Sequence, residues 1–130
     1  MSEAAGIDRD LVLNRRKRER DALLENARRY VALLSDRLSI RAAVVFGSVA
    51  RGDFNLWSDI DLLLVIDDLP ERWLDRAELL DPRPPRVQAI AWTPDEWAAQ
   101  KERNNPILMD AATTGVWLRG SATELQRAGQ

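Results

Sequence analysis

Two aspartates are the residues of this 130-residue chain whose spacing most clearly suggests chemistry. Asp59 and Asp61 stand two positions apart before the apolar run Leu62 to Ile66, so in a strand both carboxylates would point to one face. Neighbouring carboxylates repel each other unless a cation lies between them, and oxygen ligands suit Mg²⁺ or Mn²⁺. The pair therefore predicts a divalent-metal site with Asp59 and Asp61 as its ligands.

A glycine–serine pair precedes these aspartates by ten residues. Gly47 and Ser48 follow the strand-like segment Arg41 to Phe46. Glycine can adopt a positive φ and lets the backbone approach a ligand closely, and the N–H groups at the start of a helical turn suit a phosphate. Either half alone is most simply a strand-ending turn or a loop cap, but the combination favours a site for phosphate and metal.

This pattern, Gly47-Ser48 followed by Asp59-Ile60-Asp61, resembles the nucleotidyltransferase superfamily of DNA polymerase beta in its minimal form, MNT. Ala50-Arg51-Gly52 and Ser58 match further common features of the family. The motif covers about twenty residues, and a looser likeness extends from about Leu23 to Gly120. Proteins of this kind occur as antitoxins in HEPN/MNT toxin–antitoxin pairs.

The resemblance implies Mg²⁺-dependent transfer of a nucleoside monophosphate from an NTP, with ATP as the first candidate, to an acceptor hydroxyl. That acceptor can be on a HEPN toxin partner. Asp59 and Asp61 would be the catalytic, metal-binding residues, while Gly47 and Ser48 would hold the β- and γ-phosphates. Arg51 would contact the triphosphate or brace the loop, and Ser58 would cap or orient Asp59.

One position departs from the family pattern. The family usually supplies a third carboxylate from the next strand, which here is Val87 to Trp92 and contains no acid; Gln88 stands at the expected position. A glutamine offers an oxygen without negative charge. We therefore keep two hypotheses: an active nucleotidyltransferase, and a catalytically impaired member that acts as an antitoxin or interaction module by binding NTP or a protein partner.

Composition excludes several other kinds of site. The sequence has no cysteine and no histidine, which removes disulfides, thiolate or imidazole metal ligands and histidine-based catalysis. A net charge of −2 gives no general attraction to nucleic acid, and no apolar run is long enough to span a bilayer. We expect a cytoplasmic protein that does not bind nucleic acid sequence-specifically.

The pattern of apolar residues predicts an α/β fold. We expect a long N-terminal helix from about Asp8 to Leu38, a small mixed sheet of three or four strands, and helices mainly on one face; the family resemblance supplies this topology. Later helices are expected from Pro70, Pro94 and Pro106, with Thr93 and Asn105 as N-caps. The expected organisation is a polar tail and helix extension over 1–22, a nucleotidyltransferase-like domain over 23–120, and a loose tail over 121–130.

Two segments allow more than one interpretation. The wholly polar run from Asn14 to Asp21, with its basic cluster Arg15 to Arg20, has no face to bury and is either solvated helix or a contact with a partner or nucleic acid. We expect the domain to fold without residues 1–20. In the loop before Asp59, Phe54 is expected to be exposed, and Trp57 either packs against the sheet edge or stacks on the nucleotide base.

Overall fold

A four-stranded mixed sheet forms the centre of the molecule. The computed structural model describes residues 2–55 and 57–128. Its strands are β1 (Ile40–Phe46), β2 (Ile60–Ile66), β3 (Val87–Trp92) and β4 (Val116–Arg119), in the spatial order β3-β2-β1-β4. β2 and β3 run parallel, whereas β1 is antiparallel to both β2 and β4. The predicted α/β fold with a small mixed sheet is confirmed.

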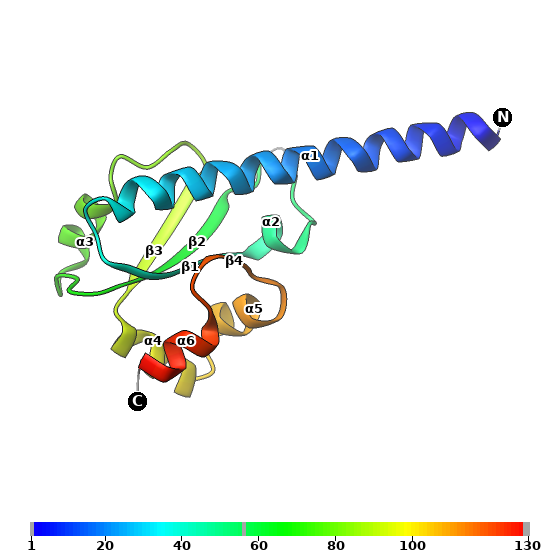
Figure 1. Cartoon of the computed structure of the whole chain (residues 1–130). Coiled ribbons are helices and arrows are strands. Elements are labelled where there is room, and N and C mark those ends of the chain that lie inside the picture. The colour runs from blue at the N-terminus through cyan, green and yellow to red at the C-terminus, as the bar shows by residue number, and fades with distance from the viewer. Residues whose placement is uncertain (1, 56, 129–130) are drawn as a thin grey trace.

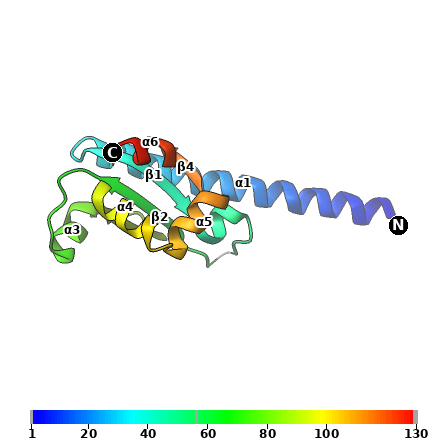
Figure 2. The same ribbon diagram turned by 90° about the horizontal axis from the view of Figure 1, so that it is seen from below.

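Helices cover both faces of this sheet, where mainly one face was expected. α1 (Ser2–Ser35) and α3 (Trp73–Leu80) lie on one side, and α4 (Pro94–Glu102), α5 (Pro106–Thr114) and α6 (Ala122–Ala128) lie on the other (Figures 1 and 2). In β2, Leu62 and Leu64 join the core beneath α1, while Leu63 and Val65 join the opposite core. A run that is apolar at every position requires cover on both faces.

The second half of α1 packs on the sheet as its apolar stripe predicts. Ala27, Tyr30, Val31 and Leu34 are at most 3% exposed. The first half extends beyond the body of the molecule (Figure 1). The helix begins at Ser2 and ends at Ser35, so its N-terminal end lies earlier in the chain than expected and its C-terminal end three residues before Leu38.

The polar run of α1 makes contacts within its own domain, which corrects the view that it has no face to bury. Arg16 donates to the carbonyl oxygens of Gly52 and Phe54 at 3.2 and 2.7 Å, and its guanidinium lies 4.8 Å from the Phe54 ring centroid. Arg20 donates to the carbonyls of Val49 and Ala50 at 2.9 and 2.8 Å. The carbonyls of Val49 and Ala50 lie in the last turn of α2 (Gly47–Arg51), where a helix leaves its acceptors unpaired, and the other two lie just after it.

Two aromatic residues of the following loop are placed opposite to expectation. Phe54 is buried beneath α1, whereas Trp57 is 88% exposed and does not pack against the sheet edge. Phe54 is covered because Arg16 reaches over its ring, a contact between residues 38 positions apart that no local pattern reveals. The alternative in which Trp57 stacks on a base remains a prediction.

α3 begins at Trp73, three residues after the predicted start at Pro70. Trp73 and Leu74 are exposed, while Leu80 and the charged Arg76 are buried. Arg76 is retained inside because it donates to Glu96 at 2.8 Å and to the carbonyls of Pro70 and Ala91. Burial alone would raise the pKa of Glu96. The hydrogen bond from the Thr93 N–H and the Arg76 guanidinium outweigh burial, so the pKa is lowered. Glu96 is therefore structural.

The C-terminal helices begin where their sequences predict, although the last segment differs from expectation. Thr93 and Glu96 form the predicted capping box of α4, and Asn105 caps α5. Residues 122–128 form α6 instead of the loose tail expected there, because Leu125 is an apolar anchor, 4% exposed, in the core beneath α4 and α5. Within residues 2–55 and 57–128, no helix combines the length and the hydrophobicity that crossing a membrane requires.

Candidate functional site

Gly47 joins β1 to the short helix α2 at the centre of the candidate site. Its φ is +76°, a conformation that side chains with a Cβ rarely adopt. A Cβ built at this position would lie 2.4 Å from Asp61 Oδ2. Glycine is therefore required here for two reasons: the turn itself and the close approach of the backbone to the Asp61 carboxylate.

Asp61 lies in the second position of β2, opposite Phe46 of β1 and Gln88 of β3. Its pKa is raised above the ordinary value, first by partial burial and then by the negative charges of Asp59 and Asp110, against the opposing effect of Arg51. Asp59 immediately precedes the strand, which begins at Ile60 rather than at Asp59. The two carboxylates thus lie close together at the N-terminal end of β2, where a cation would relieve their repulsion.

Gln88 lies beside this pair on β3, as the sequence predicts. It is the register partner of Asp61, and its Nε2 donates to Asp59 Oδ2 at 2.8 Å. The side chain is exposed at the surface. The amide therefore supplies a donor that holds Asp59 in place, at the position where the family pattern would supply a third carboxylate.

Asp110 of α5 is a site residue that sequence reasoning missed. Its Oδ2 accepts hydrogen bonds from the Gly47 N–H and from Arg51 Nη1, both at 3.0 Å, and its Oδ1 accepts one from the Thr114 hydroxyl at 2.9 Å. Arg51 also donates to Asp53 at 3.3 Å. The only local signal was an acid within the otherwise apolar stretch Ile107 to Ala112, and such an acid is ordinarily an exposed helix residue.

The remaining predicted residues lie around the turn. Ser48 is partly exposed in the first turn of α2, and its carbonyl accepts the N–H groups of Gly52 and Asp53. The Ser58 hydroxyl accepts the Asn55 N–H at 2.9 Å, and its carbonyl accepts Arg86 Nε at 3.0 Å. Ser58 therefore closes the loop before Asp59 instead of bonding to the Asp59 carboxylate.

The donor set fits one divalent ion with nucleotide better than a metal held by protein alone. In the part of the chain that the structure describes, no group of three acidic side chains is close enough to hold a metal. Mg²⁺ commonly binds through one or two carboxylates plus substrate phosphates, and Asp59 and Asp61 match that requirement. Because Gly47 has no Cβ, the turn can lie directly against the Asp61 carboxylate.

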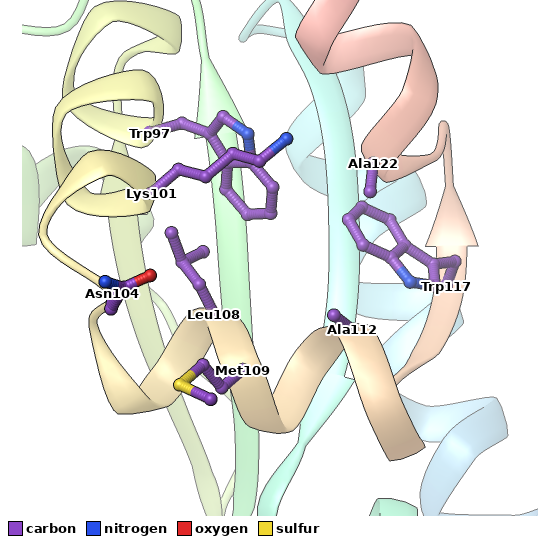
Figure 3. Close-up of a pocket in the computed structure, with 8 residues that line it drawn as sticks. All are labelled: Trp97, Lys101, Asn104, Leu108, Met109, Ala112, Trp117 and Ala122. Atoms are coloured by element: carbon purple, nitrogen blue, oxygen red, sulfur yellow. The ribbon is translucent and has the colours of Figure 1, made fainter.

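A separate apolar pocket lies on the other side of α5. It has a volume of about 260 Å³ and lies between α4, α5, β4 and α6 (Figure 3). Trp97 and Trp117 form part of its wall, with ring centroids 6.0 Å apart and an interplanar angle of 73°. No carboxylate lines it, so its chemistry does not suit a metal-bound triphosphate. α5 thus contributes Met109 to this pocket and Asp110 to the candidate site.

Solved structures with this fold include two related to nucleotide chemistry. One is a protein from Sulfolobus solfataricus assigned as a nucleotidyltransferase, with 22% identity, a TM-score of 0.59, and coverage of 78% of this chain and 84% of that one. Another is a chain from a toxin–antitoxin with AMP-PNP, with 19% identity, a TM-score of 0.51, and coverage of 77% and 78%. At these identities the likeness shows a shared fold. No curated protein matches this chain significantly.

The family model of the nucleotidyltransferase domain matches residues 27–108, which is more than half of the chain. The matched range contains β1, α2, β2 and β3, and with them Gly47, Asp59, Asp61 and Gln88. The resemblance inferred from the glycine–serine turn and the two aspartates is thereby confirmed, and this chain belongs to the nucleotidyltransferase domain family.

Proposed function

We propose that this protein transfers a nucleoside monophosphate from an NTP, with ATP as the first candidate, to a hydroxyl group of an acceptor. The observation that carries the proposal is the packing of the Gly47 turn against Asp61, with Asp59 beside it. A backbone turn that binds phosphate and carboxylates that bind metal must be adjacent to hold one metal–triphosphate group. Family membership supports the reaction class.

Asp59 and Asp61 would hold Mg²⁺ or Mn²⁺ together with the triphosphate. The bound ion would neutralise phosphate charge and polarise the phosphoryl oxygens. The raised pKa of Asp61 is consistent with this role, because a carboxylate that is costly to ionise alone gains most from a cation. Gln88 Nε2 fixes the orientation of Asp59 through its hydrogen bond.

The other residues would bind the leaving group. The N–H and hydroxyl groups of Gly47 and Ser48 would donate to the β- and γ-phosphates, and Arg51 would supply a positive charge beside them. Ser58 would keep the loop before Asp59 in shape. In the reaction the acceptor oxygen forms a bond to the α-phosphorus, the bond to the β-phosphate oxygen breaks, pyrophosphate leaves and the acceptor proton passes to water.

The acceptor we favour is a hydroxyl on a partner protein, specifically a HEPN-type toxin. The fold shared with a toxin–antitoxin chain supports a protein partner. A second candidate function follows from Gln88: a site with two acids can bind Mg-ATP while transferring slowly, and the protein would then act on its partner by binding alone. The amide donor at Asp59 is the observation that favours this second reading.

The deciding experiment incubates the protein with a HEPN-type partner, Mg²⁺ and ATP labelled at the α- or the γ-phosphate. Transfer of the α label to the partner, without the γ label, supports NMP transfer. Transfer of the γ label alone would instead identify a kinase and contradict the proposal. Absence of both labels, combined with inhibition of the partner, supports the binding-only alternative. Asp61→Asn is the negative control for chemistry.

A further inference from the structure

Asp110 bonds to two groups of the candidate site that could otherwise bind a phosphate. Its Oδ2 accepts the Gly47 N–H and one N–H of the Arg51 guanidinium, each at 3.0 Å. Both donors are among the groups that the proposed function assigns to the triphosphate, which also include Ser48. A carboxylate and a phosphate seek the same partners, namely a backbone N–H and an arginine, so the two cannot bind these donors with the same geometry at once.

We propose that Asp110 is an internal competitor for the nucleotide, and that its carboxylate must leave Gly47 and Arg51 before the triphosphate can bind them. This inference rests on the proposed function, because it assumes that the same turn binds the triphosphate. Asp110 would then set the affinity for nucleotide, and occupancy of the site would depend on where its carboxylate lies.

The surroundings of Asp110 hold it in this position. The Thr114 hydroxyl, one turn further along α5, donates to its Oδ1 at 2.9 Å, so both carboxylate oxygens have partners. The Asp110 side chain is 25% exposed, and it lies on a helix that packs against both β1 and α2. The contact is therefore made by a helix held in place by its own packing.

Charge strengthens the competition. Once displaced, Asp110 remains on α5 near Asp61, whose pKa its negative charge helps to raise. A metal-free triphosphate would then face three acidic side chains, Asp59, Asp61 and Asp110, and Mg²⁺ would relieve much of this repulsion. Removing the charge of Asp110 should therefore favour the metal-free ligand more than the Mg²⁺ complex.

The test measures binding of tripolyphosphate and of ATP by calorimetry, with EDTA and with Mg²⁺, to wild type, Asp110→Asn and Asp110→Ala. We expect metal-free tripolyphosphate to bind the variants about tenfold more tightly, since a charge-assisted hydrogen bond no longer has to be broken. The gain with Mg-ATP should be smaller. In ¹H–¹⁵N spectra, the Gly47 amide should respond to tripolyphosphate at a lower concentration in Asp110→Asn than in wild type.

Asp53→Asn is the matched control. Asp53 also pairs with Arg51, at 3.3 Å, but the Gly47 N–H bonds to Asp110. Asp53→Asn and Asp110→Asn each remove one negative charge beside the same arginine. An equal gain in tripolyphosphate affinity in both variants would mean that general electrostatics causes the effect, and would overturn the proposal. Thermal melts of each variant separate a change in binding from a loss of folding.

Three further outcomes would also overturn the proposal. Equal or weaker tripolyphosphate binding by both Asp110 variants shows that Asp110 does not compete. Weaker Mg-ATP binding by both variants identifies Asp110 as a ligand of the metal–nucleotide complex. If neither wild type nor the variants bind tripolyphosphate or ATP, the turn is not a phosphate site and Asp110 has no ligand to compete with. Failure of the proposed function is distinguishable, because tripolyphosphate binding is measured without any transfer reaction.

Discussion

At the scale of single residues, the close approach of Gly47 to Asp61 makes the strongest demand on the sequence. Gly47→Ala would place a Cβ 2.4 Å from the Asp61 oxygen at a φ of +76°. We expect Mg-ATP affinity to fall at least about tenfold and the protein to lose about 1–3 kcal/mol of stability. Calorimetry and chemical unfolding measure the two effects.

Gly52→Ala is the control for this change. Gly52 has a similar φ of +88°, but no atom lies within 4 Å of the Cβ that would be added. This variant should show backbone strain with little change in Mg-ATP affinity. Equal losses of nucleotide binding in the two variants would mean that the backbone conformation matters and the approach to Asp61 does not.

Asp61 gives the site a definite dependence on pH. Because its pKa is raised in the folded protein, first by burial and then by Asp59, the folded state binds the proton more tightly than the unfolded state. Stability conferred by this group is therefore lost as the pH rises from about 4 through the raised pKa. At pH 7 without metal, Asp61→Asn should melt about 1–3 °C higher than wild type and depend less on pH.

Thermal melts of wild type and Asp61→Asn between pH 4 and 8 check this sign. Asp95→Asn, which removes an exposed carboxylate on α4, is the control variant for the loss of one negative charge. Added Mg-ATP should reverse the order of stability, because only wild type retains both carboxylates. A lower melting temperature for Asp61→Asn than for wild type, at pH 7 without metal, would show that the Asp61 charge does not destabilise the folded protein.

Gln88 decides between the two functional hypotheses. Because it lies beside Asp61 and bonds to Asp59, Gln88→Asp would place a third negative oxygen donor at the pair. We expect NMP transfer to rise on the order of a hundredfold, and the metal-free protein to become less stable than wild type. If wild type already transfers NMP and the variant does not improve it, the third carboxylate is dispensable and the binding-only reading fails.

At the scale of elements, the polar half of α1 supports α2 and the loop that follows it. Arg16 and Arg20 donate to four carbonyls between Val49 and Phe54. The double variant Arg16→Ala/Arg20→Ala should lose about 1–3 kcal/mol of stability and bind Mg-ATP more weakly. The expectation that the domain folds without residues 1–20 stays a prediction, but these contacts imply that such a truncation would lower its stability.

The same helix provides a matched control in Arg15→Ala/Arg18→Ala. It removes the same number of arginines from the same run, but both of these side chains are exposed. Chemical unfolding should show almost no change for this pair. If the two double variants lose equal stability, net charge or helix propensity is responsible and the contacts with α2 are not.

At the scale of the whole molecule, the features that the sequence predicts are those formed by residues close together in the chain. The capping box of Thr93 and Glu96 spans four residues, and Gly47, Asp59 and Asp61 lie within fifteen positions. The burial of Arg76 and the contacts of Asp110 depend in large part on partners 15 to 63 residues away in the chain, such as Ala91 and Gly47. Those partners are set by how the helices dock on the sheet, which periodicity does not specify. From the sequence alone, Arg76 and Asp110 therefore look like ordinary surface residues.

The most direct test of the central claim is calorimetric titration of Mg-ATP into wild type and Asp61→Asn. Wild type should bind Mg-ATP, and the variant should bind it at least about tenfold more weakly because it lacks one of the two carboxylates proposed to bind the metal. Without metal the difference should shrink or reverse, because Asp61 then repels the triphosphate. Equal Mg-ATP affinity in the two proteins would contradict the assignment of this site.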